Sequence, residues 1–589
     1  MLSLVRRRVP PAPTHPEAGR GRVRHPLVLT ALLYLTVSIA LNHRVLGGFT
    51  HSSIGWVTAD ADLFAWWLHW TSWSLAHGQD PLFTVYQHFP VGVNAMWNTT
   101  VPLLGLVFAP VTLTAGPVAA YNTSMILGPV VSGLAMTAAL GRYVTRWSPR
   151  IVSGALYAFG PFHLAHMSVG HLNLVWSVMP AFLLYTVHIL FARPLRQPVL
   201  VGALIGVVFA AQTVLYTQTL ALGVLMLVVT AAVLAVRWPR RARQALPAMA
   251  TAGLACVGTY AVLCAYPLYL ILAGPARPGA QIRNPEYSGA DAYNAIVPTY
   301  LNLIRPVPDG LAGRLQGHTG EQGGYIGIAV AGLLVYIVLT VRSTAIRIAA
   351  TVGAIAFVLS LGPTLVLLGE HTGIPLPWRA VTAVPLLSQA EPVRLQIFVS
   401  LCIAMIVALW LDHVRNMQHR TERRFAIALT CVAVVSWLPA DMQAAQSATS
   451  PTFFATASNY LAPADVVETY PRLNGNWQEG AAPLRWQLIS GMAYRTTGGY
   501  FIGSDGDNDV LTETPWNAYQ LGAREIAEGR MAPGDEGADA AWRELRSTGV
   551  TVVIVAPPLK GDLVQILDWT SRVTGTIGEQ VDDVWLFRL

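Results

Sequence analysis

Two carboxylates, Asp60 and Asp62, follow the first long apolar run of the chain and precede a segment rich in tryptophan. A carboxylate can act as a general base toward a hydroxyl group when it lies within hydrogen-bond distance and its environment tunes its pKa. Aspartate is also favoured at the N-cap of a helix, where its side chain accepts backbone N–H bonds. We assign Asp62 mainly to capping and Asp60 mainly to chemistry, and the choice of base between them stays open.

The positions of these carboxylates relative to a membrane follow from the flanking sequence. The apolar run 26–43 is long enough to cross a hydrocarbon core of about 30 Å. After the carboxylates, Trp66, Trp67, Trp70 and Trp73 recur at the spacing expected of an amphipathic helix in the membrane interface. We therefore expect the two carboxylates at the lipid–water boundary, where a lipid-borne substrate can meet a water-side one.

Three histidines, His163, His166 and His171, lie near Asn173 at the predicted outer end of a span. Histidine nitrogens can bind a divalent metal, but this spacing matches no strong metal pattern. Hydrogen bonding among the rings or to a phosphate is the alternative interpretation. We assign no metal ligands, and a divalent metal stays open as a cofactor.

Arg394 opens a late apolar run in the sequence Glu391-Pro392-Val393-Arg394. A planar guanidinium offers several N–H donors and suits a phosphate group. The alternative is an interfacial arginine whose side chain reaches the water surface.

Further candidates for substrate binding are Asn94, Asn173, Glu321 and Glu391. For Asn94, at the end of Pro90-Val91-Gly92-Val93-Asn94, a structural turn is the stronger interpretation.

The composition indicates a polytopic membrane protein. Of 589 residues, 53% are hydrophobic and only 12% are charged. The net charge of +7 comes from arginine clusters between apolar runs, which is the positive-inside pattern and not a nucleic-acid module, so we expect no nucleic acid as a partner. The four cysteines lie in apolar segments and are interpreted as packing residues.

The arginine clusters predict the topology when each is placed in the cytoplasm. About eleven spans result: 26–43, 119–141, 151–166, 172–192, 199–215, 216–236, 248–272, 323–341, 349–368, 393–413 and 425–440. Residues 101–116 are then re-entrant or interfacial; if they spanned, the arginines at 142–150 would face outward. Residues 1–25 form a basic cytoplasmic tail, 26–440 the membrane domain, and 44–118 its first outer loop, so the predicted chemistry is extracytoplasmic.

The character of the chain changes after residue 440. Strand-like segments at 466–470, 550–555 and 584–589 alternate with helix-like ones at 516–528 and 538–547, which predicts a soluble α/β domain over 441–589, outside the cytoplasm. The domain has no phosphate loop and no dinucleotide-binding glycine pattern. Gly498-Gly499-Tyr500 is typical of a turn.

Several short motifs occur in a recognisable order. They are Thr58-Ala59-Asp60, Phe89-Pro90-Val91-Gly92-Val93-Asn94, Tyr121-Asn122, Phe159-Gly160-Pro161-Phe162 with Gly170-His171-Leu172-Asn173-Leu174, Gly320-Glu321-Gln322 with Tyr325-Ile326-Gly327, Leu361-Gly362-Pro363 and Glu391-Pro392-Val393-Arg394. In this order they resemble the multispanning glycosyltransferases of the GT-C superfamily, particularly YfhO-like and related actinobacterial membrane proteins. Relatives carry Gly before and Pro after the acidic residue, where this chain has Ala59 and Ala61.

The resemblance implies a GT-C-like helical membrane fold and a sugar transfer at the outer leaflet of the cell membrane. The donor would be a polyprenyl-phosphate-linked sugar, and the acceptor a cell-envelope glycan, lipid or protein. The family's base position matches Asp60, and Arg394 matches a basic residue at the start of a late span. Arg394, with His163, His166 and His171, would stabilise the leaving phosphate, and inversion at the anomeric carbon is expected.

Two other classes of function remain as alternatives. A transporter or flippase is less favoured because few ionisable residues lie near the middle of the spans and no inverted repeat is found. A non-catalytic membrane scaffold with an outer binding domain would have almost the same sequence pattern. In each case membrane lipids surround the chain.

Overall fold

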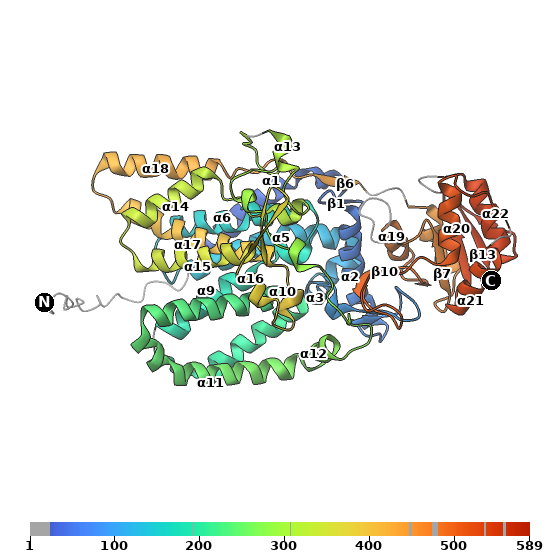
Figure 1. The fold of residues 1–589 in the computed structure, drawn as a ribbon, viewed down its shortest axis with the longest axis horizontal. Helices are drawn as coiled ribbons and strands as arrows, with labels where there is room; N and C mark the ends of the chain where they lie inside the picture. The colour runs from blue at the N-terminus through green and yellow to red at the C-terminus, as the bar shows by residue number, and fades with distance from the viewer. Residues whose placement is uncertain are drawn as a thin grey trace.

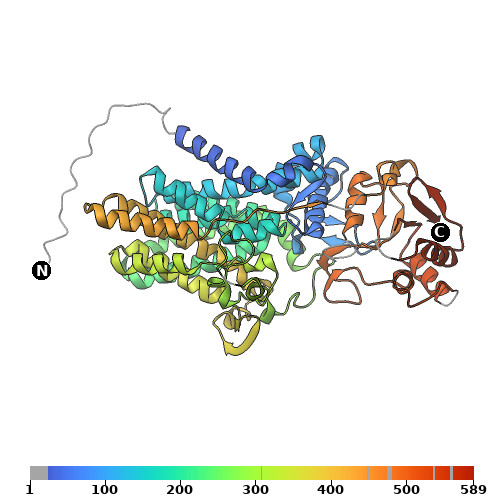
Figure 2. The same cartoon turned by 90° about the horizontal axis from the view of Figure 1, so that it is seen from above.

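The computed structural model describes residues 24–192, 194–306, 308–446, 450–473, 481–534, 537–557 and 561–589. It is elongated, with a bundle of helices at one end and a smaller α/β domain at the other (Figure 1). The same division is seen from above in Figure 2. Of the predicted basic tail 1–25, all but the last two residues lie outside the described residues.

The helical part begins with α1 and ends with α18. Its helices are α1 (Arg24–Leu41), α2 (Thr58–Ala76), α3 (Pro102–Val107), α4 (Ala109–Ala115), α5 (Pro117–Leu140), α6 (Trp147–Ala158), α7 (Pro161–Ser168), α8 (Leu172–Val175), α9 (Val178–Ala192), α10 (Pro198–Arg237), α11 (Pro239–Leu263), α12 (Ala265–Leu272), α13 (Asp309–Ala312), α14 (Ile328–Thr340), α15 (Thr344–Ser360), α16 (Trp378–Val381), α17 (Gln396–Arg415) and α18 (Arg420–Val435). Short strands accompany them: β1 (Ser52–Ile54), β2 (Phe83–Thr84), β3 (Val93–Asn94), β4 (Thr364–Leu367) and β5 (Glu370–Pro375).

In the part of the chain that the structure describes, fewer continuous helices reach the length of a span than the eleven spans predicted. Within the described residues, five helices are long and apolar enough to cross a membrane by length and composition: Pro117–Leu140, Leu172–Phe191, Pro198–Arg237, Pro239–Leu263 and Pro392–Arg415. Shorter apolar helices cover Pro26–Leu41, Ile328–Thr340 and Thr344–Ser360. The prediction counted each apolar run of the sequence as one span. In the structure, several of these runs are divided between two helices or begin with charged residues.

The breaks have local causes. The predicted span 151–166 is divided between α6 and α7 at Phe159 and Gly160, because Pro161 lacks an N–H and starts a new helix. The boundary predicted between the spans 199–215 and 216–236 is confirmed, because α10 consists of two helices that join at a kink, where Tyr216 is non-helical (φ −168°, ψ 109°). Residues 101–116 fold as α3 and α4, of 6 and 7 residues, each much shorter than a membrane span.

Helix α2 lies across the end of the bundle that faces the α/β domain, roughly perpendicular to the long helices (Figure 1). The prediction of an amphipathic interfacial helix is wrong, because α2 is buried on nearly all sides. Trp66, Trp67 and Trp70 are each at most 1% exposed. Helices α3, α4 and α5 of the bundle and α19 (Ala482–Ile489) of the α/β domain pack around it. The carboxylates at its start are therefore inside the protein.

The start of α2 is fixed by the motif Tyr121-Asn122 on α5. The Asn122 amide donates to the carbonyls of Phe49 and Ser52 at 2.9 and 2.8 Å and accepts from the Ile54 N–H at 3.0 Å. The Tyr121 hydroxyl donates to the Ile54 carbonyl at 2.9 Å. These four hydrogen bonds hold the segment before α2 against the long buried helix α5. They thereby fix the positions of Asp60 and Asp62 in the fold.

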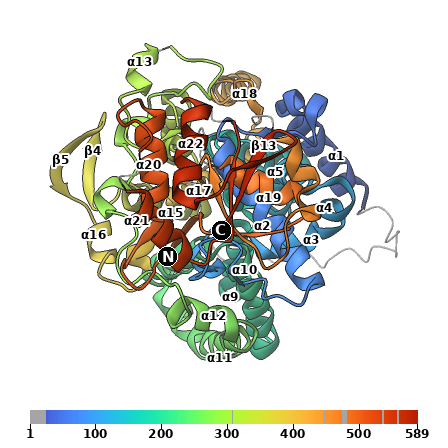
Figure 3. The ribbon, with the colours of Figure 1, turned by 90° about the vertical axis from the view of Figure 1, so that its right-hand side faces the viewer.

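The α/β domain is built on a five-stranded sheet with the order β12-β13-β11-β7-β8. Strands β7, β8 and β11 are parallel to one another, and β13 runs antiparallel to β11. The remaining elements are β6 (Ala444–Gln446), β7 (Val466–Tyr470), β8 (Arg495–Thr496), β9 (Tyr500–Gly503), β10 (Leu511–Glu513), β11 (Val552–Val555), β12 (Glu579–Val581), β13 (Val584–Arg588), α20 (Ala518–Ala527), α21 (Ala538–Ser547) and α22 (Leu563–Thr574). Figure 3 looks onto this domain, with α20 and α22 in front of the bundle.

Contacts beside α2 dock the α/β domain onto the segment 44–118 of the bundle. Strand β6 pairs antiparallel with β1, just before α2. The Gln487 side chain on α19 accepts from the Trp66 indole N–H at 2.7 Å and donates to the Tyr86 carbonyl at 2.9 Å. The domain therefore covers α2 and can contribute side chains to whatever site α2 forms.

Candidate functional site

Asp60 is the centre of the candidate site. It lies in the first turn of α2 and is 8% exposed. Its Oδ1 accepts a hydrogen bond from the Tyr500 hydroxyl at 2.9 Å, and its Oδ2 lies 3.3 Å from Nε2 of His171. Burial raises the pKa of this carboxyl, but the hydrogen bonds and charge of His171, together with the Tyr500 hydroxyl, outweigh it and hold the pKa below its usual value. Asp60 is thus a buried, oriented carboxylate.

A row of histidines leads away from Asp60. The Nδ1 atoms of His166 and His171 are 3.0 Å apart, and the two rings stack with centroids 5.2 Å apart. His318, in the loop after α13, meets the His171 ring edge-on at 5.5 Å. Burial lowers the pKa of His318 to about 3, so this ring is neutral at ordinary pH.

The backbone just before His171 adopts a conformation with a positive φ angle. Gly170 has φ +86°, and a Cβ there would lie 2.9 Å from the Tyr121 hydroxyl. Gly55, with φ +97°, would likewise meet the Gly170 N–H at 2.9 Å. Glycine is therefore required at both positions, which brings the turn after α7 against the segment before α2. This close approach places His171 beside Asp60.

A second group of charges surrounds Arg394, which follows the turn before α17. Its guanidinium pairs with Glu391 and donates to Gln218 at 2.6 Å. Glu391 also pairs with Arg283, and Glu321 lies 3.6 Å from Arg394. The guanidinium of Arg394 also donates to the Tyr216 hydroxyl at the break in α10.

The charges of this group do not cancel. Burial, with the nearby Glu391 charge, raises the pKa of Glu321 well above its usual value, which favours its neutral form. Two guanidiniums, Arg283 and Arg394, then share one remaining carboxyl partner, Glu391. Glu391 raises the pKa of Arg283 most, and Glu321, Tyr500 and Asp60 add to this effect, so the charges around Arg394 and those around Asp60 act on the same guanidinium.

Two cavities reach this region. One, of about 210 Å³, is lined by Arg283, Glu391 and Arg394, with Trp97, Leu268 and Ile271 among its apolar walls. The other, of about 540 Å³, is lined by residues from both sides of α13, and His318, Trp56 and Tyr300 form part of its wall. Because His318 contacts His171, the histidine row lies between the second cavity and Asp60.

Asp62 has a different environment, and its predicted capping role is wrong. The N-cap of α2 is Val57, so Asp62 lies one turn inside the helix. Its Oδ1 accepts two hydrogen bonds from Arg485 on α19, from Nε at 3.0 Å and from Nη2 at 2.8 Å. A third N–H of Arg485 donates to the His51 carbonyl. Asp62 therefore joins the α/β domain to the bundle.

Asn94, another predicted site residue, has structural partners. The Asn94 amide donates to the carbonyls of Leu270 and Pro275 at 2.9 and 3.0 Å and accepts from the Met96 N–H at 3.0 Å, and the residue is fully buried. Asn94 thus holds a turn and has no free amide group for a substrate, as the turn interpretation predicts.

His163 points away from the histidine row. It is fully buried and packs edge-on against Tyr157 and Phe162, with ring centroids 5.3 and 5.7 Å away. The Phe162 ring also packs edge-on against His166, with ring centroids 4.4 Å apart, so this phenylalanine contacts both histidines. Asn173 is buried in α8, two residues after His171.

No metal centre is formed by these side chains. Within the described segments, no three His, Cys, Asp or Glu side chains converge as a metal ion requires. The Nδ1 atoms of His166 and His171 face each other in a hydrogen bond, which is a use of these nitrogens different from shared metal ligation.

The sequence interpretation did not identify Tyr500 and His318 as residues of the site. It also did not predict that Arg283 forms an ion pair there. Tyr500 comes from β9 of the α/β domain, in a stretch interpreted as a turn. The paired glycines before it were the signal in the sequence, since a Cβ on Gly498 would lie 2.8 Å from the Cβ of Leu473 and one on Gly499 would lie 2.7 Å from the Phe501 ring. His318 lies three residues before Glu321, which was recognised.

Comparison with known proteins gives weak likenesses. No family model and no curated protein matches the chain. Among solved structures it is similar to the oligosaccharyltransferase AglB from Archaeoglobus fulgidus in complex with an inhibitory peptide and a dolichol-phosphate, at 11% identity over 90% of this chain and 69% of that one, with a TM-score of 0.47. It is also similar to the mycobacterial arabinofuranosyltransferase AftD, at 14% identity over 96% of this chain and 41% of that one, with a TM-score of 0.43. Likenesses this weak leave the function to be argued from the site.

Proposed function

We propose that this chain is a multi-pass membrane glycosyltransferase of the GT-C type, with its site and its α/β domain outside the cytoplasm. It would transfer a sugar from a polyprenyl-phosphate-linked donor to a hydroxyl of a cell-envelope glycan, lipid or protein. The observation that carries the proposal is the presence, in one region of the fold, of a buried, oriented carboxylate, Asp60, and of a separate guanidinium group, Arg394, that lines a partly apolar cavity. The order of short motifs along the chain supports the same family.

In the proposed reaction, Asp60 accepts the proton of the acceptor hydroxyl. The acceptor oxygen forms a bond to the anomeric carbon while the bond from that carbon to the phosphate oxygen breaks. The polyprenyl phosphate leaves with the electron pair. A single displacement of this kind inverts the configuration of the anomeric carbon.

The hydrogen bonds to Asp60 support this role. Tyr500 binds one carboxylate oxygen and His171 the other, so the carboxylate is ionised and fixed in direction before substrate arrives. Prior orientation is a major part of what a catalytic group contributes, because little reorganisation is then needed during the reaction.

The charge around Arg394 supports a phosphate site. With Glu321 favouring its neutral form, the two guanidiniums, Arg283 and Arg394, outnumber their remaining carboxyl partner, Glu391. A phosphate monoester that leaves during the reaction would be stabilised by that charge and by guanidinium N–H donors. The apolar residues Trp97, Leu268 and Ile271 in the same cavity suit a lipid chain attached to that phosphate.

An assay of sugar transfer from donor to acceptor tests the proposal. The full chain is reconstituted in lipid nanodiscs and mixed with a panel of polyprenyl-phosphate sugars labelled in the sugar, together with alkyl glycoside acceptors. Wild type should transfer label from at least one donor, and Asp60→Asn should not. Asp80→Asn, which changes a carboxylate beyond the other end of α2, is the matched control and should keep activity. Transfer by Asp60→Asn at the rate of the control would overturn the mechanism.

A further inference from the structure

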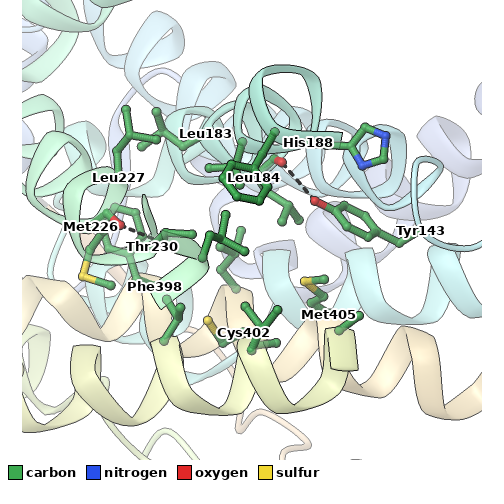
Figure 4. A pocket seen from close by; sticks show the side chains of 18 of the residues that line it. Tyr143, Leu183, Leu184, His188, Met226, Leu227, Thr230, Phe398, Cys402 and Met405 are labelled. Atoms are coloured by element: carbon green, nitrogen blue, oxygen red, sulfur yellow. Dashed lines mark hydrogen bonds between the residues drawn. The ribbon is translucent and has the colours of Figure 1, made fainter. Parts of the chain in front are cut away.

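A separate apolar cavity of about 250 Å³ lies inside the bundle, remote from Asp60. Its walls come from α9, α10, α15 and α17, with Tyr143 and Trp238 from adjoining turns. Figure 4 shows Phe398, Cys402 and Met405 in a row along α17, opposite Met226 and Thr230. Nearly all the lining side chains are apolar, so the cavity does not suit water or a polar substrate.

The cavity runs from a buried interior to an exposed rim. Phe398, Cys402 and Met405 are buried. Leu184, Val187 and His188 are half-buried, and Arg241, which also lines the cavity, is exposed. In Figure 4, Tyr143 and His188 stand at the end of the cavity away from Phe398, with their rings close together. Their ring centroids are 5.1 Å apart. The cavity therefore has an apolar depth and a polar mouth.

The mouth opens at the basic end of the bundle, which we define as the turns after α5, α9, α10, α14 and α17. In Figure 1 these turns lie at the end opposite the α/β domain. Their arginines include Arg142, Arg196, Arg240, Arg241, Arg342 and Arg415. Asp412, which pairs with Arg146, and Glu422 are the acidic residues of the described segments 142–150, 194–196, 237–243, 342–347 and 412–424. The basic end is thus complementary to an anionic group.

We propose that this cavity is a binding site for one anionic phospholipid, with an acyl chain between α9, α10, α15 and α17 and its phosphate at Arg241. A dry cavity among helices loses dispersion contacts that a hydrocarbon chain restores. Tyr143, His188 and Trp238 at the mouth have the amphipathic character found at membrane interfaces. The lipid would hold α9 against α15 from the leaflet opposite the Asp60 site.

Native mass spectrometry tests the site without any assay of activity. The full chain is reconstituted in nanodiscs of equal parts phosphatidylglycerol and phosphatidylcholine and then released into the gas phase. Wild type should retain one phosphatidylglycerol in preference to phosphatidylcholine. Arg241→Gln should lower that retention about fivefold, the usual effect of one basic residue near an anionic lipid. Arg240→Gln, which removes a neighbouring exposed arginine that does not line the cavity, should change it little.

A second variant tests the apolar part of the cavity. Ala345→Phe, at the half-buried wall on α15, should reduce retention of either lipid because the new ring occupies the cavity. Equal retention of the two lipids by wild type, or equal loss in Arg241→Gln and Arg240→Gln, would overturn the proposal. Retention of a co-purified polyprenyl phosphate in place of phosphatidylglycerol would also overturn the proposal. It would indicate that the cavity binds the polyprenyl chain of the sugar donor.

Discussion

The hydroxyl of Tyr500 lies 2.9 Å from Oδ1 of Asp60, although 440 positions separate the two residues in the chain. The α/β domain therefore supplies part of the site and does more than cover it. Because this hydrogen bond stabilises the charged form of Asp60, it gives the domain a way to set the protonation of the proposed base.

Tyr500→Phe should shift the pH dependence of transfer. The Tyr500 hydrogen bond lowers the pKa of Asp60, so its removal raises that pKa. Asp60 acts when ionised, and the acidic limb of the kcat/KM profile should therefore move to higher pH, by about one unit for a hydrogen bond to a charged group. Tyr460→Phe, an exposed tyrosine of the same domain, is the control. An unshifted limb in Tyr500→Phe would contradict this link.

Asp60→Asn should reduce transfer by ~10²–10⁴-fold, the usual cost of losing a general base. The amide has almost the same volume as the carboxyl, so the variant should insert and unfold as wild type does. Transfer rates with the most active labelled donor measure the effect. If Asp62→Asn were instead the inactive and fully folded variant, the role of base would move to Asp62.

Breaking the pair of Asp62 and Arg485 should destabilise the docked α/β domain. Their side chains are 5% and 11% exposed, and Arg485→Met leaves a buried carboxylate without its partner. Removing one member of a buried ion pair typically costs ~3–5 kcal/mol. Thermal unfolding of the full chain measures the loss. Arg530→Gln, which removes an exposed pair with Glu525, should leave the unfolding temperature unchanged.

Arg394→Lys should weaken binding of the donor even though it keeps a positive charge. A guanidinium can contact Glu391, Gln218 and a phosphate from one rigid plane, whereas an ammonium is a single point on a flexible stem. Binding of a polyprenyl-phosphate analogue to wild type, Arg394→Lys and Arg394→Ala measures the effect. Arg415→Lys, at the other end of α17, is the matched control. Equal affinity in all four proteins would remove Arg394 from the donor site.

The orientation of the chain can be tested by labelling introduced cysteines with an impermeant reagent in intact cells. Exposed Cys431 is first replaced by serine. A cysteine at Ser547, exposed in the α/β domain, should react, and one at Arg241 should not, because arginine clusters favour the cytoplasmic side. The reverse result would place the Asp60 site inside the cell and contradict the proposed extracytoplasmic reaction.

The local sequence determined much of the architecture. Apolar runs predicted α5, α10 and α17, because the period and length of hydrophobic residues depend only on neighbours in the chain. The same reasoning placed strands at 466–470 and 584–589, where the structure has β7 and β13. Residue type also singled out Asp60, His171 and Arg394, because a carboxylate, an imidazole and a guanidinium can take part in acid–base chemistry or bind a phosphate.

Only the tertiary structure decided how these residues are used. Asp60 and Asp62 are two positions apart in the chain, yet one faces Tyr500 and His171 and the other Arg485, because α2 turns their side chains toward different neighbours. Tyr500 and Arg485 come from a domain more than 400 residues further along. Such partners depend on how the α/β domain docks on α2, and docking depends on packing across many distant residues, which the pattern around any one of them does not contain.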